Sequence, residues 1–263
     1  MLAAAVVIAG ASGCGGNPTT SASVIADAAT KTSAASTARI HESVSGSLSG
    51  RALGEGSLDG VVDGRHARGY VRFDFKFLAQ ADPSVNAEAL EGKVVFSGKR
   101  AFLTNPAIAA RLPSGKRWLE ATYEQLQATG GTSGGFGGVG TLDPTKPVDH
   151  LRAVTGDAEE LRGEPIDGMP TKHLRAELDY RDYVALVPAS ERAPLQKGVD
   201  RLEQVLGSTT SPVEVWIAPD GTIVRTKGTI EGRGLRLEYT LDLIEVGDPV
   251  RIREPDPAIV RRL

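Results

Sequence analysis

Few residues of this chain have the types and the spacing that catalysis requires. Gly131–Gly135, "GTSGG", has the G-x-S-x-G spacing of a nucleophile elbow, which needs a strand before the serine and a helix after it. The surrounding "TGGTSGGFGGVG" predicts neither element. Gly135, Gly137 and Gly140 have the spacing of a dinucleotide fingerprint, but no strand or βαβ unit is predicted around them. Because glycine leaves the backbone with few restrictions, we interpret Gly130–Gly140 as a loop and as the candidate for a movable lid.

The other groups that could carry chemistry are four histidines and one cysteine. The histidines lie far apart in the sequence, with no H-E-x-x-H motif or closely spaced pair, so no metal and no cofactor are predicted. Folding can still bring two of them together, which leaves metal or general-base chemistry open as an alternative. Cys14 is the single cysteine, which excludes an intramolecular disulfide and a Cys/His zinc ligand set. We expect no catalytic residue; the histidines are His41, His66, His150 and His173.

Cys14 follows a short apolar segment and a group of small residues. Leu2–Gly10, "LAAAVVIAG", is an uncharged run of nine residues, too short to span a bilayer as a helix but of the length of a signal-peptide core. Ala11, Ser12 and Gly13 then precede the cysteine. The segment resembles a bacterial lipobox, which implies cleavage before Cys14 and its diacylation; the alternative is a small buried cysteine. Since a diacylglyceryl group supplies the two chains that stable anchoring needs, we expect a lipid anchor in the cell membrane, on its extracytoplasmic face.

The chain is expected to have three parts. Residues 1–13 form a lipoprotein signal peptide, residues 14–22 form a flexible tether rich in Gly, Pro and Ser, and residues 23–263 form one domain. A length of 263 residues with 40% hydrophobic residues is sufficient for a domain with a sizeable core. The net charge of −3 gives no bulk attraction to nucleic acid.

Alternating apolar and polar residues predict half-buried strands. "YVRFDFKF" at 70–77, "LRAELDY" at 174–180 and "LRLEYTLDL" at 235–243 each place apolar side chains on one face. This period of two is typical of an antiparallel sheet with one covered face. Further strands are predicted at 40–47, 56–62, 94–96, 101–104, 213–217 and 223–230, with a turn at Pro219-Asp220-Gly221 joining the last two as a hairpin.

Helical spacing interrupts these strands. An Ala-rich helix is predicted over Thr20–Arg39 and a second helix between Pro194 and Gly207. Shorter helices are predicted over 145–154 and 122–128. Because helices and strands alternate without a βαβ rhythm, the fold class is α+β: one large curved antiparallel sheet, a half-barrel, with helices across its concave face.

Two turn-rich motifs resemble those of a known family. Glu164–His173, "EPIDGMPTKH", and Val215–Ile223, "VWIAPDGTI", look like the paired signature of actinobacterial lipoproteins of the LppX/LprG type. The opening segment "AATKTSAASTARI" and Leu151–Gly156, "LRAVTG", fit the same pattern. That family is similar in fold to the carriers LolA and LolB, in which helices close a half-barrel around an apolar cavity. The resemblance implies a lipid-binding domain for acylated lipids or lipoglycans, their transfer, and no catalytic residues.

The covered faces of two predicted strands are therefore candidates for a cavity wall. A strand of eight or nine residues is roughly 30 Å long, comparable with an extended acyl chain. We expect a monomer that binds an acylated lipid or lipoglycan, attaches to the membrane through Cys14, works with a lipid transporter and binds no nucleic acid. The alternatives are an envelope-assembly lipoprotein with a filled core that acts through protein partners, and an extracytoplasmic hydrolase. The wall candidates, which a filled core would bury equally, are Val71, Phe73, Phe75, Phe77, Leu235, Leu237, Tyr239 and Leu241.

Overall fold

The computed structural model describes residues 21–35, 37–82, 84–122, 125 and 147–263. These residues form a twelve-stranded sheet in the order β12-β6-β5-β4-β3-β2-β1-β11-β10-β9-β8-β7. All neighbouring strands are antiparallel except β12 and β6, which are parallel. The strands are β1 Thr37–Leu48, β2 Arg51–Asp63, β3 Arg68–Asp74, β4 Glu91–Ser97, β5 Arg100–Thr104, β6 Trp118–Thr122, β7 Glu159–Leu161, β8 Lys172–Asp179, β9 Thr210–Ile217, β10 Ile223–Gly232, β11 Leu235–Ile244 and β12 Val260–Arg262.

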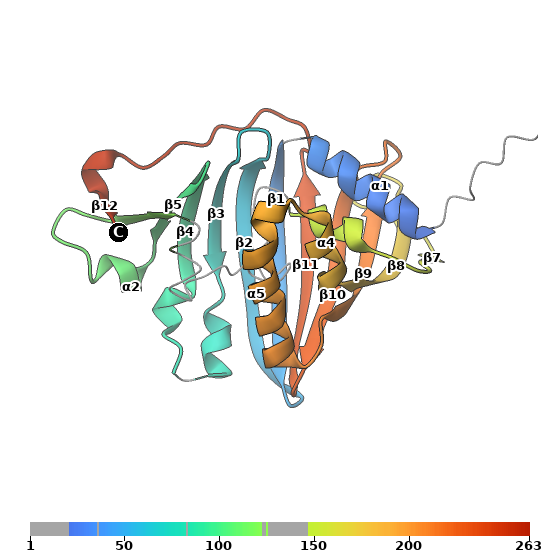
Figure 1. The fold of residues 1–263 in the computed structure, drawn as a ribbon, viewed down its shortest axis with the longest axis horizontal. Coiled ribbons are helices and arrows are strands. Elements are labelled where there is room, and N and C mark those ends of the chain that lie inside the picture. The colour runs from blue at the N-terminus through green and yellow to red at the C-terminus, as the bar shows by residue number, and fades with distance from the viewer. Residues whose placement is uncertain (1–20, 36, 83, 123–124, 126–146) are drawn as a thin grey trace, which may run out of the picture.

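Helices lie on the inner, concave face of this curved sheet, as predicted from the sequence. In Figure 1, α1, α4 and α5 lie together in front of one half of the sheet, where α1 lies against β8 and β10, and α5 against β10. The main apolar core fills the space between the helices and the sheet. The helices are α1 Ser21–Ala34, α2 Pro106–Ala109, α4 Tyr180–Leu186 and α5 Ala189–Leu206, with short 3-10 helices η1 Lys76–Gln80, η2 Ala87–Ala89, η3 Asp149–Ala153 and η4 Pro257–Ile259.

Helix α1 is fixed to the sheet by its small apolar face and one buried hydroxyl. Ile25 and Ala29 are fully buried, and alanines allow the helix to approach its neighbours closely. The Thr32 hydroxyl donates to the Ala28 carbonyl at 2.7 Å and accepts the Ile223 amide of β10 at 2.8 Å. This contact joins the opening helix to a strand 191 residues later in the chain.

The family-like motif at 164–173 has a structural role on the outer face of the sheet. Its centre is a tight hairpin in which Ile166 and Met169 exchange two backbone hydrogen bonds of 2.9 Å. Asp167 and Gly168 have φ values of 50° and 81°, as a type I′ turn requires. The hairpin brings Ile166 into a small apolar cluster with Trp216. The turn-rich residues of this motif therefore cover an outer-face tryptophan.

The segment after β11 returns to the opposite edge of the sheet. It runs along the top of Figure 1 to β12, which pairs with β6. On the way, the Glu254 carboxylate accepts from the Ser97 hydroxyl at 2.6 Å and from Arg100 at 2.8 Å. The outer-face residues Val95 and Phe102 are buried in this half of the sheet. Strands β4 and β5 are thus buried on both faces.

The predicted elements differ from the structure mainly at their ends. The strand predicted at 70–77 stops at Asp74 and continues as the 3-10 helix η1, because the Phe75 amide bonds to the Leu90 carbonyl at 2.8 Å instead of to a strand. The opening helix ends at Ala34, so that β1 can begin at Thr37. The helix predicted over 145–154 is the 3-10 helix η3 in its described part. The helix predicted over 122–128 lies mostly outside the described residues.

Candidate functional site

Strand register places the six wall candidates of β3 and β11 on the inner face of the sheet, while Phe75 and Phe77 follow the end of β3. Phe73 faces Leu58 of β2, which faces Glu42 of β1, which in turn faces Leu241 of β11. The candidates on β3 and β11 are therefore separated by two strands. Seven of the eight candidates are buried and Leu235 is partly buried; the seven are Val71, Phe73, Phe75, Phe77, Leu237, Tyr239 and Leu241.

Glycines on the two intervening strands allow these side chains to meet. A Cβ atom on Gly46 of β1 would lie 2.6 Å from the Phe77 ring and 3.1 Å from the Leu237 side chain. A Cβ atom on Gly56 of β2 would lie 2.7 Å from the Phe75 ring and 2.9 Å from the Phe77 ring. Since the contacts with the phenylalanine rings are closer than real Cβ atoms show, only glycine leaves room for these rings. Phe77 and Leu237, which are far apart in the sequence, are thus neighbours above Gly46.

The same arrangement of a large side chain over a glycine recurs along the inner face. Val71 lies over Gly60, where a Cβ atom would approach it to 2.8 Å, and the Tyr239 ring lies over Gly228, where the distance would be 2.4 Å. Phe73 and Phe75 stack with ring centroids 6.2 Å apart. Together these contacts form a continuous apolar band that we call the inner stripe: Val71, Phe73, Phe75, Phe77, Leu237 and Tyr239.

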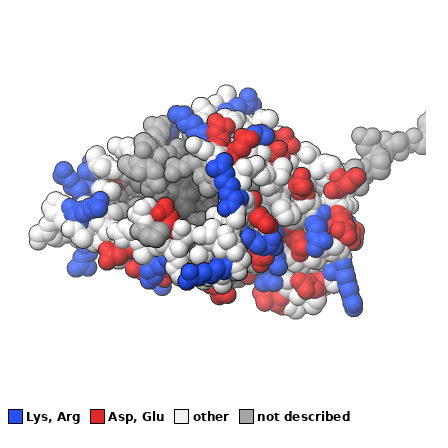
Figure 2. Space-filling view, turned by 90° about the horizontal axis from the view of Figure 1, so that it is seen from below, with Lys and Arg blue, Asp and Glu red and all other residues white. Residues whose placement is uncertain are grey.

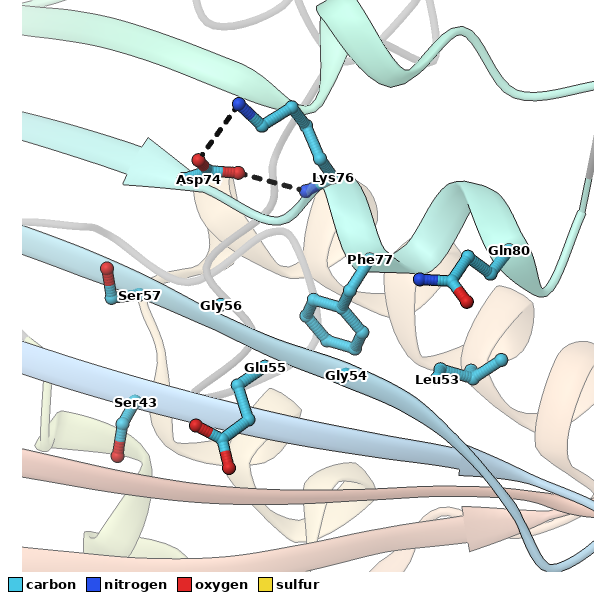
Figure 3. A pocket seen from close by; sticks show the side chains of 10 residues that line it. All are labelled: Ser43, Leu53, Gly54, Glu55, Gly56, Ser57, Asp74, Lys76, Phe77 and Gln80. Carbon is cyan, nitrogen blue, oxygen red and sulfur yellow. Dashed lines mark hydrogen bonds and ion pairs between the residues drawn. The ribbon is translucent and has the colours of Figure 1, made fainter.

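A pocket of about 660 Å³ opens at the Phe77 end of the inner stripe. It lies where β3 ends at Asp74 while β2 continues toward Arg51 paired with β1. Its volume is in the range of ligand sites, about 300–1,000 Å³, and its rim is charged, since Lys76 pairs with Asp74 at 3.1 Å and with Glu91 at 2.8 Å. The lining residues, drawn in Figure 3, are Ser43, Leu53, Gly54, Glu55, Gly56, Ser57, Asp74, Lys76, Phe77 and Gln80.

The Tyr239 end of the inner stripe adjoins a buried polar cluster, Glu42, His150, Tyr180 and Tyr239, which we call the inner polar cluster. Each of these residues is at most 3% exposed. Glu42 and Tyr239 are diagonal neighbours on β1 and β11, and the rings of Tyr180 and His150 are 6.1 Å apart. The Tyr180 and Tyr239 hydroxyls lie close enough to alter each other's pKa, but neither makes a well-formed hydrogen bond.

Burial keeps the inner polar cluster uncharged at neutral pH. Desolvation raises the pKa of Glu42 from 4.5 to about 8, because burial disfavours the carboxylate. Desolvation lowers the pKa of His150 from 6.5 to about 4, against the opposing effect of the Asp149 carboxylate. Burial also raises the pKa of Tyr180 to about 12 and that of Tyr239 well above 10. A protonated carboxyl, a neutral imidazole and two phenols therefore face the interior.

The other histidines are placed apart from this cluster. His41 and His66 are exposed and pair with Asp59 and Asp63, each at 2.7 Å. His173 stacks on Trp216 on the outer face, with ring centroids 4.0 Å apart, and lies 3.0 Å from Glu214. Within the described ranges, no group of three His, Cys, Asp or Glu residues could hold a metal ion. The same part of the chain contains no helix that is long and apolar enough to cross a membrane.

Two predicted features lie outside the described residues: Cys14 and the loop at 130–140 that contains the G-x-S-x-G pattern.

On the face of the molecule shown in Figure 2, acidic and basic side chains are interspersed. This pattern is typical of an ordinary solvated surface.

Comparison with solved structures gives names that match the family suggested by the two turn motifs. The chain is similar to LprF from Mycobacterium bovis, with 15% identity and a TM-score of 0.48, covering 89% of this chain and 96% of that one. It is also similar to the Mycobacterium tuberculosis lipoprotein LppX, with 17% identity and a TM-score of 0.46, covering 89% and 100%. A LolA superfamily protein from Nitrosomonas europaea has 11% identity and a TM-score of 0.33, covering 92% and 98%. No protein-family model and no curated protein matches the sequence.

Sequence reasoning missed the glycines under the inner stripe and the inner polar cluster. Gly54, Gly56 and Gly60 on β2 are separated by even numbers of residues, so they lie on one face of the strand, and Gly46 on β1 lies on the same face of the sheet. This even spacing was the available signal for the glycines under the stripe. Glu42 carried a weaker signal, since it occupies an inward position in the alternating segment 38–44. His150 and Tyr180 enter the cluster only through tertiary structure.

Proposed function

We propose that this protein is a membrane-anchored extracytoplasmic lipoprotein that binds an acylated lipid or lipoglycan along the inner stripe, without catalysis. The observation that carries the proposal is the continuity of the stripe, from the pocket at Phe77 to the buried Tyr239. Aromatic and aliphatic side chains from both halves of the sheet make one apolar path. Transfer of an acyl chain onto such a surface gains about 0.8 kcal/mol per buried CH₂ group.

The pocket gives such a ligand a route between solvent and the stripe. Phe77 belongs to both the pocket and the inner stripe. The pocket residues Ser43, Glu55 and Ser57 lie on the outer face of β1 and β2. An amphipathic ligand could place its acyl chain against Phe77 and leave a hydrated group near the charged rim at Lys76. The lipobox-like segment at Cys14 supports the membrane anchor in the proposal, and transfer of the bound lipid to a transporter is part of the same proposal.

The competing function is an assembly lipoprotein whose interior is simply filled. One observation favours it: the stripe residues are as buried as ordinary core residues, with Phe75 only 2% exposed. A filled interior would not accept an acyl chain. The two functions therefore differ in whether a lipid reaches the inner face.

Photocrosslinking distinguishes them. A phospholipid with a diazirine in one acyl chain is incubated with the full chain, illuminated, and the labelled peptides are identified by mass spectrometry. We expect labelling within 71–77 and 235–241, suppressed by unlabelled phospholipid. Labels confined to outer-face residues, or none at all, would favour the filled-core function.

Two phenylalanine variants provide a matched pair for this experiment. Phe77 lies on the inner stripe, whereas Phe102 lies on the outer face of β5, and both are buried. Phe77→Ala and Phe102→Ala should each lower the free energy of unfolding, because both open a space in a packed region. Only Phe77→Ala should reduce labelling by the lipid. Equal effects of the two variants on labelling would mean that it reports general destabilisation.

A further inference from the structure

The inner polar cluster is unusual because its polar atoms lack well-formed hydrogen bonds. Glu42 Oε1, His150 Nδ1 and the hydroxyls of Tyr180 and Tyr239 are buried, and none of them makes a hydrogen bond of good geometry with a described residue, although the two hydroxyls lie near each other. Most buried polar groups in folded proteins are hydrogen-bonded, and each exception calls for an explanation such as a missing water or ligand. Four such atoms from the sheet, α4 and η3 meet in one region.

The position of the cluster points to a ligand. Glu42 lies in a cross-strand row with Phe73, Leu58 and Leu241, which are all apolar and buried. Tyr239 belongs to the inner stripe as well as to the cluster. The inner stripe therefore leads from Phe77 past Leu237 to the cluster at Tyr239. A lipid whose acyl chain lies along the stripe would place the polar group at the end of that chain next to these buried polar atoms.

We propose that Glu42, His150, Tyr180 and Tyr239 form an internal subsite for an uncharged polar group of the bound lipid, a hydroxyl or an ester or amide carbonyl. This inference rests on the proposed function and adds the class of ligand. The hydroxyl groups of the tyrosines and the carboxyl of Glu42 donate hydrogen bonds to a carbonyl, and Nδ1 of neutral His150 is available to donate or accept according to its tautomer.

The absence of a positive charge in the cluster selects against anionic groups. Burial keeps Glu42 protonated and His150 neutral at pH 7. None of the four residues of the inner polar cluster is a Lys or an Arg. A phosphate or carboxylate at this depth would lose its hydration without gaining a counter-ion, which is costly. An acylglycerol fits the subsite better than a phosphatidic acid with the same acyl chains.

The test compares these two lipids on the full chain. Dioleoylglycerol and dioleoylphosphatidic acid are titrated against a pyrene-labelled fatty acyl probe bound to the protein. Tyr180→Phe and Tyr239→Phe each remove one buried hydroxyl that makes no well-formed hydrogen bond. Tyr183→Phe is the matched control, because Tyr183 is also buried on α4 but its hydroxyl donates to the Asp149 carboxylate at 2.9 Å.

We expect dioleoylglycerol to bind at least tenfold more tightly than dioleoylphosphatidic acid. Loss of one hydrogen bond should weaken dioleoylglycerol about 5- to 10-fold in Tyr180→Phe and Tyr239→Phe, with little change in Tyr183→Phe. Equal binding of both lipids, unaffected by the variants, would refute the subsite and leave the proposed function intact. If the probe and both lipids fail to bind, the proposed function fails and the subsite with it.

Unfolding of the lipid-free variants provides a second measurement. If the two hydroxyls await a ligand, their removal should leave the stability of the lipid-free protein unchanged or higher, since an unsatisfied buried group is lost. If structural water satisfies them, both variants should be less stable and should bind dioleoylglycerol as the unmodified chain does. The latter result would overturn the proposal.

Discussion

Glu42 should make this protein lose stability as the pH rises from 6.5 to 8. Its pKa is about 8 in the folded state against 4.5 ordinarily, so the folded protein holds a proton that the unfolded chain releases. Stability therefore falls with increasing pH between these values. At about 1.4 kcal/mol per pKa unit, the whole shift corresponds to a loss on the order of 5 kcal/mol.

His150 changes the window in which this loss is visible. Its folded pKa of about 4 lies below the ordinary 6.5, so its contribution to stability rises with pH over that interval and offsets that of Glu42. Above pH 6.5 the contribution of Glu42 outweighs the remaining one of His150, which gives a net loss of about 1 kcal/mol by pH 8. The surface carboxyls with lowered pKa values affect stability only under more acidic conditions; they are Asp82, Glu214, Asp220 and Glu254.

Urea unfolding at pH 6.5, 7.0, 7.5 and 8.0, extrapolated to water, measures this loss. Glu42→Gln has no proton to release, so its free energy of unfolding should not fall over the range. Glu55→Gln is the control, because Glu55 is an exposed glutamate on the neighbouring strand, and it should lose stability as the unmodified chain does. Parallel curves for Glu42→Gln and the unmodified chain would refute the assignment of a buried, protonated carboxyl.

Three further predictions concern the packing that supports the site. Gly46→Val should lower the free energy of unfolding by about 1–3 kcal/mol through overpacking against Phe77, whereas Ser45→Val, on the outer face, should change it by less than about 0.5 kcal/mol; urea titration of both variants checks this. Trp216→Ala should lower the free energy of unfolding by about 3–5 kcal/mol yet leave phospholipid photolabelling unchanged, because it lies on the outer face. Asp179→Ala should lower it by about 1 kcal/mol in the same titration, since its carboxylate caps α4.

The fold was predictable where periodicity is strong. The alternation in "LRLEYTLDL" predicted the inner face of β11, and that in "YVRFDFKF" predicted β3. Successive side chains of a strand point to opposite faces, so the alternation alone identifies the residues of each face. The turn at Asp220 and Gly221 followed from its residue types, and in the structure the Asp220 carboxylate accepts from the Thr222 amide at 2.9 Å. Local rules were sufficient for these elements.

Other features depended on contacts between distant segments. Phe75 and Phe77 leave the strand because the Phe75 amide bonds to the Leu90 carbonyl, and their rings then lie near Gly56 on β2, which the local alternation does not encode. Tyr180 begins the short helix α4, and its amide bonds to the Thr209 carbonyl at 3.0 Å, 29 residues later. The short edge strands β7 and β12 have three residues each, too few to show a period. The inner polar cluster was unpredictable for the same reason, since its members come from 42, 150, 180 and 239.

Native mass spectrometry tests the central claim most directly. The full chain is purified from an actinobacterial host under mild conditions, its mass is measured before and after collisional activation, and any released ligand is extracted into organic solvent and identified. The proposed function predicts a discrete added mass that is lost on activation and extracts as an acylated lipid. A bare protein that also fails to take up added phospholipid, glycolipid or dioleoylglycerol would contradict it and favour action through a protein partner.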